Sequence, residues 1–208
     1  MPEFTELVEG YQRFKLGAYT KQKTRYDHLA AEGQAPPIMI ISCCDSRVDP
    51  ATIFDTVPGQ VFALRNVANL VPPFQIDNGL HGVSAAIEFG ALGLCVRHIV
   101  VLGHAQCGGI QASLDGTGVE NDDYSFINSW VDILRESRDK VVLQKLPNPQ
   151  HALELEAIKV SLANLRSFPF IVEREQKELL KLHGAYFGIG DGVLQILNEA
   201  TGEFEPQS

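Results

Sequence analysis

The sequence predicts a single α/β domain built on a mainly parallel β-sheet with helices on both of its faces. Short apolar runs without polar alternation recur along the chain, and stretches with apolar residues at helical spacing separate them. Strands without polar alternation suit a sheet that is covered on both faces. Strands separated by helices need crossover connections, which make neighbouring strands parallel. The chain of 208 residues is long enough for one full hydrophobic core, so we expect one domain over residues 1–208.

Residues 1–33 are predicted to form a helical arm at the start of this domain. Apolar residues between Phe4 and Phe14 recur on one stripe, which predicts an amphipathic helix over residues 3–16. A more polar helical stretch follows to about residue 32, where the sequence GQAPP ends it.

Three strands are predicted in the first half of the chain, at IMIIS, GQVFALRN and RHIVVLGH, with a helix within residues 78–94. Two further helices are predicted outside the sheet, over residues 122–137 and 149–166. The tail GAYFGIGDGVLQIL predicts a strand, a Gly-Asp-Gly turn and another strand, which would add an antiparallel edge near the C-terminus.

The composition narrows the possible partners and the location. A net charge of −9 argues against nucleic acid as a partner, because such binding needs clustered cations. We expect no membrane span, since no apolar run reaches about 20 residues, and no secretory leader, so the protein is expected to be cytoplasmic. In a reducing compartment, its four cysteines favour metal binding or catalysis over disulfides.

Chemically active residues follow two of the predicted strands. CCDSR comes after IMIIS and supplies two cysteines, an aspartate and an arginine, while GHAQCGG follows IVVL and supplies His104 and Cys107. Ligands of open parallel sheets bind beyond the carboxyl ends of the strands, so these residues can form one metal site. Two thiolates and one imidazole suit zinc, and three protein ligands leave a fourth position open for water.

Asp45 and Arg47 decide whether such a site is open. Asp45 can occupy the fourth position itself, unless Arg47 holds its carboxylate away in a charge-assisted pair. We therefore interpret these two residues as a switch between an open and a closed zinc site.

The motifs CCDSR, RNVANLVPPF and GHAQCGG, in this order, resemble those of the β-class carbonic anhydrases. The strong motifs cover about residues 34–110, and SLANLRSFPF and LHGAYFGI fit the family's looser pattern. The resemblance implies that Cys43, His104 and Cys107 bind one Zn²⁺ and that Cys44, in the variable position, is a packed thiol. It also implies that zinc-bound hydroxide converts CO2 to bicarbonate and a proton, with Asp45 orienting the hydroxide and Arg47 holding Asp45.

The resemblance further implies a plant-like subtype with an open site. Ile40 stands where bicarbonate-regulated members have a tryptophan, and Gln34 stands where plant-like members hydrogen-bond substrate or product. Without that tryptophan, Arg65 is expected to tie a turn or a subunit contact. The remaining substrate-pocket positions implied are Phe62, Val67, Phe89 and Gly108, with Phe89 replacing a common tyrosine.

Relatives of this kind form homodimers, often paired into homotetramers, with the N-terminal helix of one subunit lying across the other. The amphipathic helix at residues 3–16 fits that role, and Gln34 and Phe62 would then serve a neighbouring subunit's zinc.

Other interpretations of the same residues remain open at this stage. Asp45 could close the zinc site and leave a non-catalytic scaffold, or the adjacent Cys43 and Cys44 could support thiol redox chemistry. A CO2 analogue such as carbonyl sulfide or carbon disulfide could be the substrate. Gly108 and Gly109 lack the Lys-Ser or Lys-Thr of a phosphate loop, so we expect them to permit close backbone approach near the metal. Cys95 is expected to be a core thiol.

Overall fold

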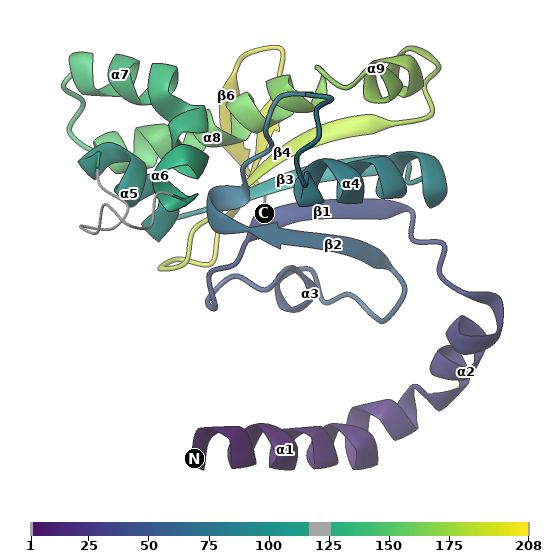
Figure 1. Cartoon of the computed structure of the whole chain (residues 1–208). Coiled ribbons are helices and arrows are strands. Elements are labelled where there is room, and N and C mark those ends of the chain that lie inside the picture. The colour runs from purple at the N-terminus through teal and green to yellow at the C-terminus, as the bar shows by residue number, and fades with distance from the viewer. Residues whose placement is uncertain (1, 117–125, 208) are drawn as a thin grey trace.

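The computed structural model describes residues 2–116 and 126–207, and within them the strands form one six-stranded sheet in the order β2-β1-β3-β4-β5-β6 (Figure 1). The first four of these strands, β2, β1, β3 and β4, pair in parallel, whereas β4 with β5 and β5 with β6 are antiparallel. The predicted α/β class, parallel sheet and antiparallel C-terminal edge are therefore confirmed. The strands are β1 (Ile38–Cys43), β2 (Val61–Asn66), β3 (His98–His104), β4 (Lys181–Phe187), β5 (Leu194–Asn198) and β6 (Glu203–Pro206).

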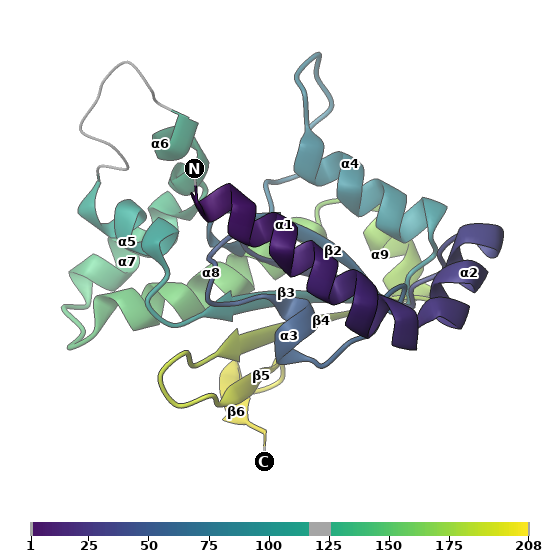
Figure 2. The ribbon, with the colours of Figure 1, turned by 90° about the horizontal axis from the view of Figure 1, so that it is seen from below.

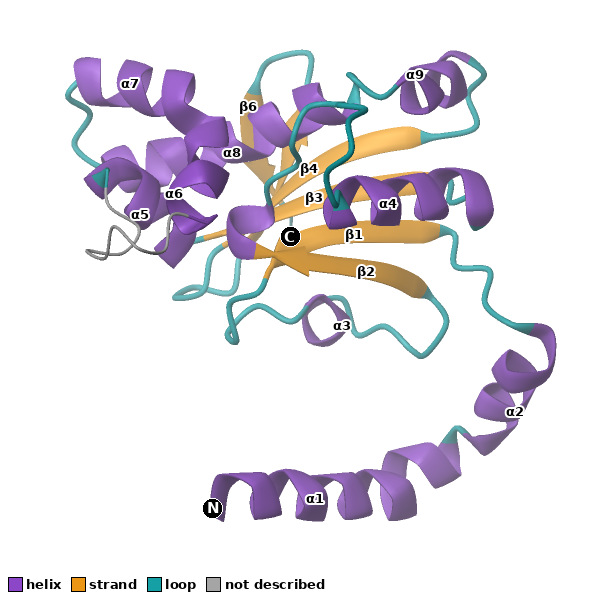
Figure 3. Cartoon of the chain, in the orientation of Figure 1, coloured by secondary structure: helices purple, strands orange, loops and turns teal. Residues whose placement is uncertain are grey.

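The helices cover the two faces of the sheet unequally, as Figure 3 shows: α4, α8 and α9 lie on one face and the short α3 lies on the other. No helix within the described ranges combines the length and the apolar character that crossing a bilayer requires. The helices are α1 (Pro2–Phe14), α2 (Lys23–Glu32), α3 (Pro50–Ile53), α4 (Gly82–Glu88), α5 (Gly108–Asp115), α6 (Phe126–Val131), α7 (Arg135–Leu143), α8 (Pro149–Leu165) and α9 (Pro169–Gln176).

Most predicted elements are present, with some differences in extent. The helix expected over residues 149–166 is α8, which begins with an Asn148 cap and a proline in its first turn. Of the helix expected over residues 122–137, residues 122–125 lie outside the described part, and the rest is divided into α6, a 3₁₀ turn (Asp132–Leu134) and α7. Four short elements, α3, α5, α9 and β6, were not predicted from the sequence.

The main core lies between the sheet and the helices α4, α8 and α9. Met39 and Ile41 of β1 point into it, while Ile40 between them belongs to a smaller cluster on the other face. The apolar run of β1 is thus buried on both faces, as its lack of polar alternation predicts.

The first two helices form an arm that stands off from the rest of the chain (Figures 1 and 2). Neither α1 nor α2 contains a buried residue, and α1 leaves Phe4 69% and Leu7 71% exposed. The arm touches the body near β2, where the Arg25 Nε donates to the Pro58 carbonyl at 2.6 Å. The expected amphipathic helix is present, and most of its apolar stripe is exposed; at its end, Phe14 packs against the rings of Tyr19 and Tyr26.

Helix α8 lies close to the sheet because two strands carry glycine where it passes. A Cβ on Gly103 of β3 would lie 2.7 Å from Cδ1 of Ile158, and one on Gly184 of β4 would lie 2.9 Å from Cγ2 of the same residue. Such distances are shorter than normal contacts, so the glycines set how near α8 can lie.

We therefore expect Gly103→Ala to lower the free energy of unfolding by about 1–3 kcal/mol, because the added methyl group overpacks the contact with Ile158. Urea denaturation measures this change. Gly190→Ala is the control, since a Cβ there has no atom within 4 Å. Equal stability of the two variants would contradict the expectation.

Candidate metal centre

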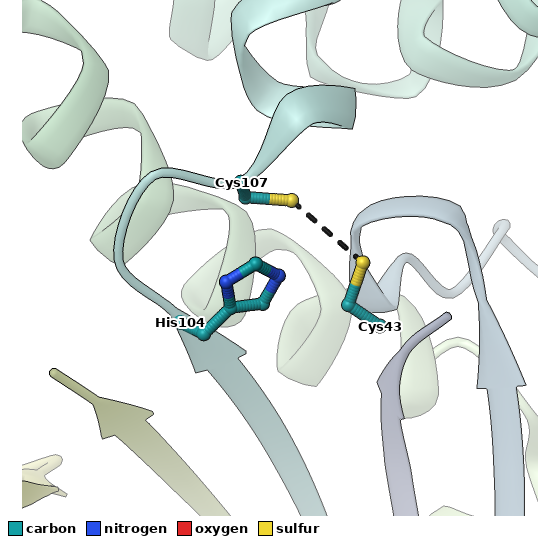
Figure 4. Close-up of side chains that lie close together, drawn as sticks. All are labelled: Cys43, His104 and Cys107. Carbon is teal, nitrogen blue, oxygen red and sulfur yellow. Dashed lines mark hydrogen bonds between the residues drawn. The ribbon is translucent and has the colours of Figure 1, made fainter. Parts of the chain in front are cut away.

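Three metal-binding side chains converge at the carboxyl edge of the parallel sheet. Cys43 ends β1, His104 ends the adjacent strand β3, and Cys107 follows three residues later (Figure 4). The sulfur atoms of the two cysteines are 3.8 Å apart, and the three donor atoms all lie within 4.8 Å of one another. All three side chains are buried, so few water molecules compete for them.

The imidazole of His104 is oriented for metal binding. Its Nδ1 lies 2.8 Å from the carbonyl oxygen of Ala105, and because a carbonyl only accepts, Nδ1 must donate. Nε2 then carries the lone pair, and this buried atom has no hydrogen-bond partner among the described residues. A histidine whose second nitrogen is fixed in this way is the usual arrangement of a metal ligand.

The spacing of the sulfur atoms suits zinc. With Zn–S bonds of about 2.3 Å and tetrahedral angles, two thiolates around one zinc ion lie about 3.8 Å apart. The separation of 3.8 Å between Cys43 and Cys107 matches this value. The donor set, the burial and the spacing therefore all fit Zn²⁺.

The protonation of the three side chains also favours a cation between them. The hydrogen bond from Cys107 lowers the pKa of the Cys43 thiol to about 4, and the same contact raises the pKa of Cys107. Burial lowers the pKa of His104, but the neighbouring Cys43 sulfur, the Ala105 carbonyl and the charge of Asp45 together outweigh burial and raise the pKa overall. Without a cation, only one sulfur readily loses its proton; a divalent ion would stabilise both thiolates.

The turn that carries Cys107 leads directly into α5. The backbone N–H groups of Gly109 and Ile110 favour the thiolate form of Cys107. A Cβ on Gly109 would lie 2.6 Å from Cγ1 of Val67, so close approach is required at this glycine. Close backbone approach was expected at Gly108 as well, but a Cβ there would meet no atom within 4 Å.

Asp45 and Arg47 form the pair that the open state requires. The Arg47 Nε and Nη2 donate to the two carboxylate oxygens of Asp45 at 2.9 and 2.7 Å, and the Arg47 backbone N–H donates to Oδ1 at 2.9 Å. These bonds hold the pKa of Asp45 well below its usual range. Asp45 does not belong to the group of three donors.

A second arginine fixes the segment that follows Cys43. The Arg65 Nε donates to the Cys43 carbonyl at 2.9 Å, and its Nη2 donates to the Asp45 carbonyl at 2.7 Å. Arg65 therefore ties a turn, as expected. After β2, the carbonyl of Val67 accepts a hydrogen bond from the Trp130 indole at 2.8 Å, a contact that was not predicted from the sequence.

Three of the proposed pocket residues lie away from the centre of their own chain. Phe62 pairs with Met39 near the start of β1, and its ring lies 5.8 Å from that of Phe89. Gln34 is exposed in the segment that leads into β1. The six residues of β1 span roughly 16 Å between this end and Cys43, so these side chains cannot meet the same chain's metal.

Two cysteines differ from their expected environment. Cys44 and Cys95 are both exposed, whereas we expected a packed thiol and a core thiol. Cys44 follows the last residue of β1, where the chain leaves the sheet, and Cys95 has a positive φ of 54° in the turn before β3. The apolar residues around Cys44 and Cys95 in the sequence do not indicate that either cysteine lies in an exposed turn.

A buried carboxylate next to the centre was missed. Glu154 of α8 is 3% exposed, and its Oε1 accepts a hydrogen bond from the backbone N–H of Cys107 at 3.0 Å. Helical spacing offered a signal, because Glu154 precedes the buried Ala157 and Ile158 by three and four residues and so shares their face.

Fold and site together define an α/β protein with a Cys₂His centre suited to zinc. Residues 38–194 match the model of the carbonic anhydrase family. Beta carbonic anhydrase 5, chloroplastic, of Arabidopsis thaliana is 37% identical over 193 residues, which are 90% of this chain and 62% of that relative. The chain thus spans less than two thirds of the length of this relative.

Two solved structures share the fold over nearly the whole chain. The β-carbonic anhydrase CcaA has a TM-score of 0.92 and 30% identity, covering 100% of this chain and 94% of its own. A tetrameric β-carbonic anhydrase from Sordaria macrospora has a TM-score of 0.81 and 26% identity, and the match covers 95% of this chain and 98% of that structure's chain. The chain belongs to the carbonic anhydrase family, in its β class.

We expect Arg47→Ala to release Asp45 toward the metal, because both side-chain hydrogen bonds to its carboxylate are lost and only the one from the backbone N–H of residue 47 remains. The pKa of Asp45 should rise toward its ordinary value of about 3.9, so that the carboxylate remains ionised at neutral pH and free to bind zinc. A crystal structure of the zinc-loaded variant at neutral pH should show an Asp45 oxygen on the metal. Arg138→Ala, which removes a surface pair with Asp139, is the control. An Asp45 that stays off the metal in the Arg47 variant would refute the expectation.

Proposed function

We propose that this chain catalyses the reversible hydration of carbon dioxide to bicarbonate and a proton, with one Zn²⁺ held by Cys43, His104 and Cys107. The observation that carries the proposal is the convergence of three buried donor atoms at zinc spacing, with Asp45 bound to Arg47 instead of joining them. Membership of the β-class family supports the same reaction.

Each residue then has a defined task. Zinc held by these three ligands would act as a Lewis acid and make hydroxide available near neutral pH. Asp45 accepts a hydrogen bond from the attacking water and orients it, while Arg47 keeps the carboxylate off the metal. Arg47 also donates to the Gln106 carbonyl at 3.1 Å, so it links the two ligand-bearing segments.

The substrate pocket is proposed to be composite. Gly108 follows Cys107 and Val67 lies against the adjacent Gly109, so these two would line the pocket of their own chain. Gln34, Phe62 and Phe89 would come from a second subunit. Their position at the opposite end of the sheet supports this arrangement. It also requires at least a homodimer, in which the apolar stripe of α1 would lie across the partner; the relative from Sordaria macrospora is tetrameric.

Further parts of the proposal rest on the sequence and the family. The chain would act as one domain with residues 1–33 as its arm, on CO2 and bicarbonate, in the plant-like open subtype without nucleic acid or membrane partners. A cytoplasmic location stays a prediction, and the Arabidopsis relative is a chloroplastic protein.

The alternatives receive less support from the geometry. A scaffold with a closed zinc site needs Asp45 on the metal, yet this carboxylate is held by Arg47. Redox chemistry within the pair Cys43 and Cys44 is disfavoured because the sulfur atom of Cys43 lies against that of Cys107, while Cys44 is exposed. Activity on a CO2 analogue would use the same centre. Assays with CO2 and with the analogue distinguish this alternative from CO2 hydration.

The zinc-loaded enzyme should hydrate CO2 with a rate that rises above about pH 7, because the attacking water must lose its proton. Stopped-flow measurement with a pH indicator follows this rate. Asp45→Ala should lose on the order of 10²-fold or more in kcat, and Asp139→Ala, an exposed aspartate of α7, should match the wild type. A flat profile from about pH 6 to 9 would refute the proposed role of water ionisation.

A mixed dimer tests the composite pocket. One subunit carries Gln34→Ala with an intact centre, and the other carries His104→Ala with an intact Gln34. If Gln34 serves the partner, the zinc of the first subunit meets the intact Gln34 of the second, and the dimer should have wild-type kcat/KM per zinc.

Two differently tagged chains allow the mixed dimer to be purified for this measurement. Replacing Gln34→Ala by Asp45→Ala in the first subunit gives the control, which should stay inactive because Asp45 acts in its own chain. A mixed dimer as impaired as the Gln34→Ala homodimer would show that Gln34 does not act across the interface.

A further inference from the structure

Behind the candidate metal centre, α8 places the only acidic side chain among the buried residues that the structure describes. Glu154 is 3% exposed. Its Oε1 accepts from the Cys107 backbone N–H at 3.0 Å, and its Oε2 accepts from the Tyr186 hydroxyl at 2.8 Å. Both oxygens of the carboxylate are therefore hydrogen-bonded.

The charge of Glu154 has no fixed cation beside it. No lysine or arginine of the described residues pairs with it, and the only near basic group is the half-exposed His151, whose Nδ1 lies 3.8 Å from Oε2. That nitrogen lies closer, at 3.0 Å, to the Tyr186 hydroxyl. Burial and the bond to Glu154 raise the pKa of Tyr186, so this hydroxyl stays neutral and donates. A buried carboxylate normally needs a cationic partner or a metal nearby.

The backbone that Glu154 holds is the turn between two metal ligands. Gln106 in this turn has a positive φ of 55°, which a residue with a side chain rarely adopts. The turn is held from two sides: Arg47 donates to the Gln106 carbonyl, and Gln150 of α8 donates to the Cys107 carbonyl at 3.4 Å. Glu154 adds the bond to the N–H of Cys107 itself.

We propose that Glu154 is a positioning residue of the metal centre, which anchors the Cys107 turn and whose buried negative charge increases the affinity of the centre for a divalent cation. The two thiolates neutralise a divalent ion formally, so the carboxylate leaves the loaded centre with a net negative charge. The carboxylate contacts the backbone of a metal ligand, and in this buried environment its charge is weakly screened. The charge therefore favours the metal-loaded centre over the metal-free one. The same charge would have no cation to stabilise it in the empty centre.

Glu154→Gln separates the effect of the negative charge from the effect of the hydrogen bond that anchors the Cys107 turn. The glutamine oxygen can still accept from the Cys107 N–H, and its size is nearly unchanged, but the negative charge is gone. Glu154→Leu removes both. Glu156→Gln is the matched control, because Glu156 lies two residues further along the same helix and pairs at the surface with Lys159.

Zinc affinity is measured by competition with a chromophoric chelator, and ligand geometry by the absorption spectrum of the Co²⁺-substituted proteins. Glu154→Gln should bind zinc about tenfold more weakly with an unchanged Co²⁺ spectrum. Glu154→Leu should bind still more weakly, with a shifted spectrum, because the Cys107 turn is no longer anchored. Glu156→Gln should match the wild type in both measurements.

Urea denaturation of the metal-free variants excludes a merely structural role. Glu154→Gln should leave the stability of the metal-free protein unchanged or higher, since an uncompensated buried charge is removed. Wild-type zinc affinity in Glu154→Gln would overturn the proposal, and so would a loss of metal-free stability that accounts for the whole effect. If Glu154→Leu does not fold, Glu154→Gln alone decides.

The inference rests on zinc as the metal of the proposed function, and metal analysis of the wild type separates the two. A wild-type protein that takes up no zinc would refute the proposed function. A wild type that binds zinc and hydrates CO2, with Glu154→Gln unchanged in zinc affinity, would refute only the role of Glu154.

Discussion

The parallel pairing of β1 with β3 is the constraint on which the candidate centre depends. The register runs from Ile38 opposite His98 to Ser42 opposite Leu102, so Cys43 and His104 leave the sheet at the same edge. A slip by one residue would move Cys43 by about 3.3 Å along β1 relative to His104 and would change the distance between their donor atoms. The apolar residues that fix this register are buried on both faces, so the hydrophobic core and the metal-binding geometry have one common cause.

Helix α8 couples that core to the centre. Its contact with two glycines of β3 and β4 brings it within hydrogen-bond distance of the loops at the carboxyl edge. Ser161 accepts from the Val71 N–H and donates to the Asn69 carbonyl, which fixes the turn after β2. Glu154, two turns earlier, holds Cys107. One helix therefore positions both segments that flank the metal, and a change in its packing would reach the centre without touching a ligand.

The sequence allowed the fold to be predicted where one pattern dominated. The strands with continuous apolar runs and the long helix α8 were found because burial of that extent requires such patterns. Short elements such as α3 and β6 depend on local caps and pairing that the pattern does not show. For the metal centre, the types and order of the residues were enough to predict two thiolates and one imidazole as ligands. The family resemblance was needed to choose Cys43 over Cys44 as the first ligand. Glu154 was missed because α8 was interpreted as an outer helix, where a glutamate is ordinary.

The two ends of the sheet pose different problems, and a second copy of the chain would solve both. At the carboxyl edge the centre of one chain lacks the proposed pocket residues Gln34 and Phe62, which lie at the other end of β1 and β2. At the N-terminus, the apolar stripe of α1 is exposed to solvent, at a cost of roughly 25 cal/mol for each Å² of apolar surface. A helix of 13 residues without a buried residue in its own chain gains most of its stability from packing against another surface. An arm lying across a partner would bury that stripe and bring the partner's sheet close, so the requirement of the pocket and that of the arm are met by the same association.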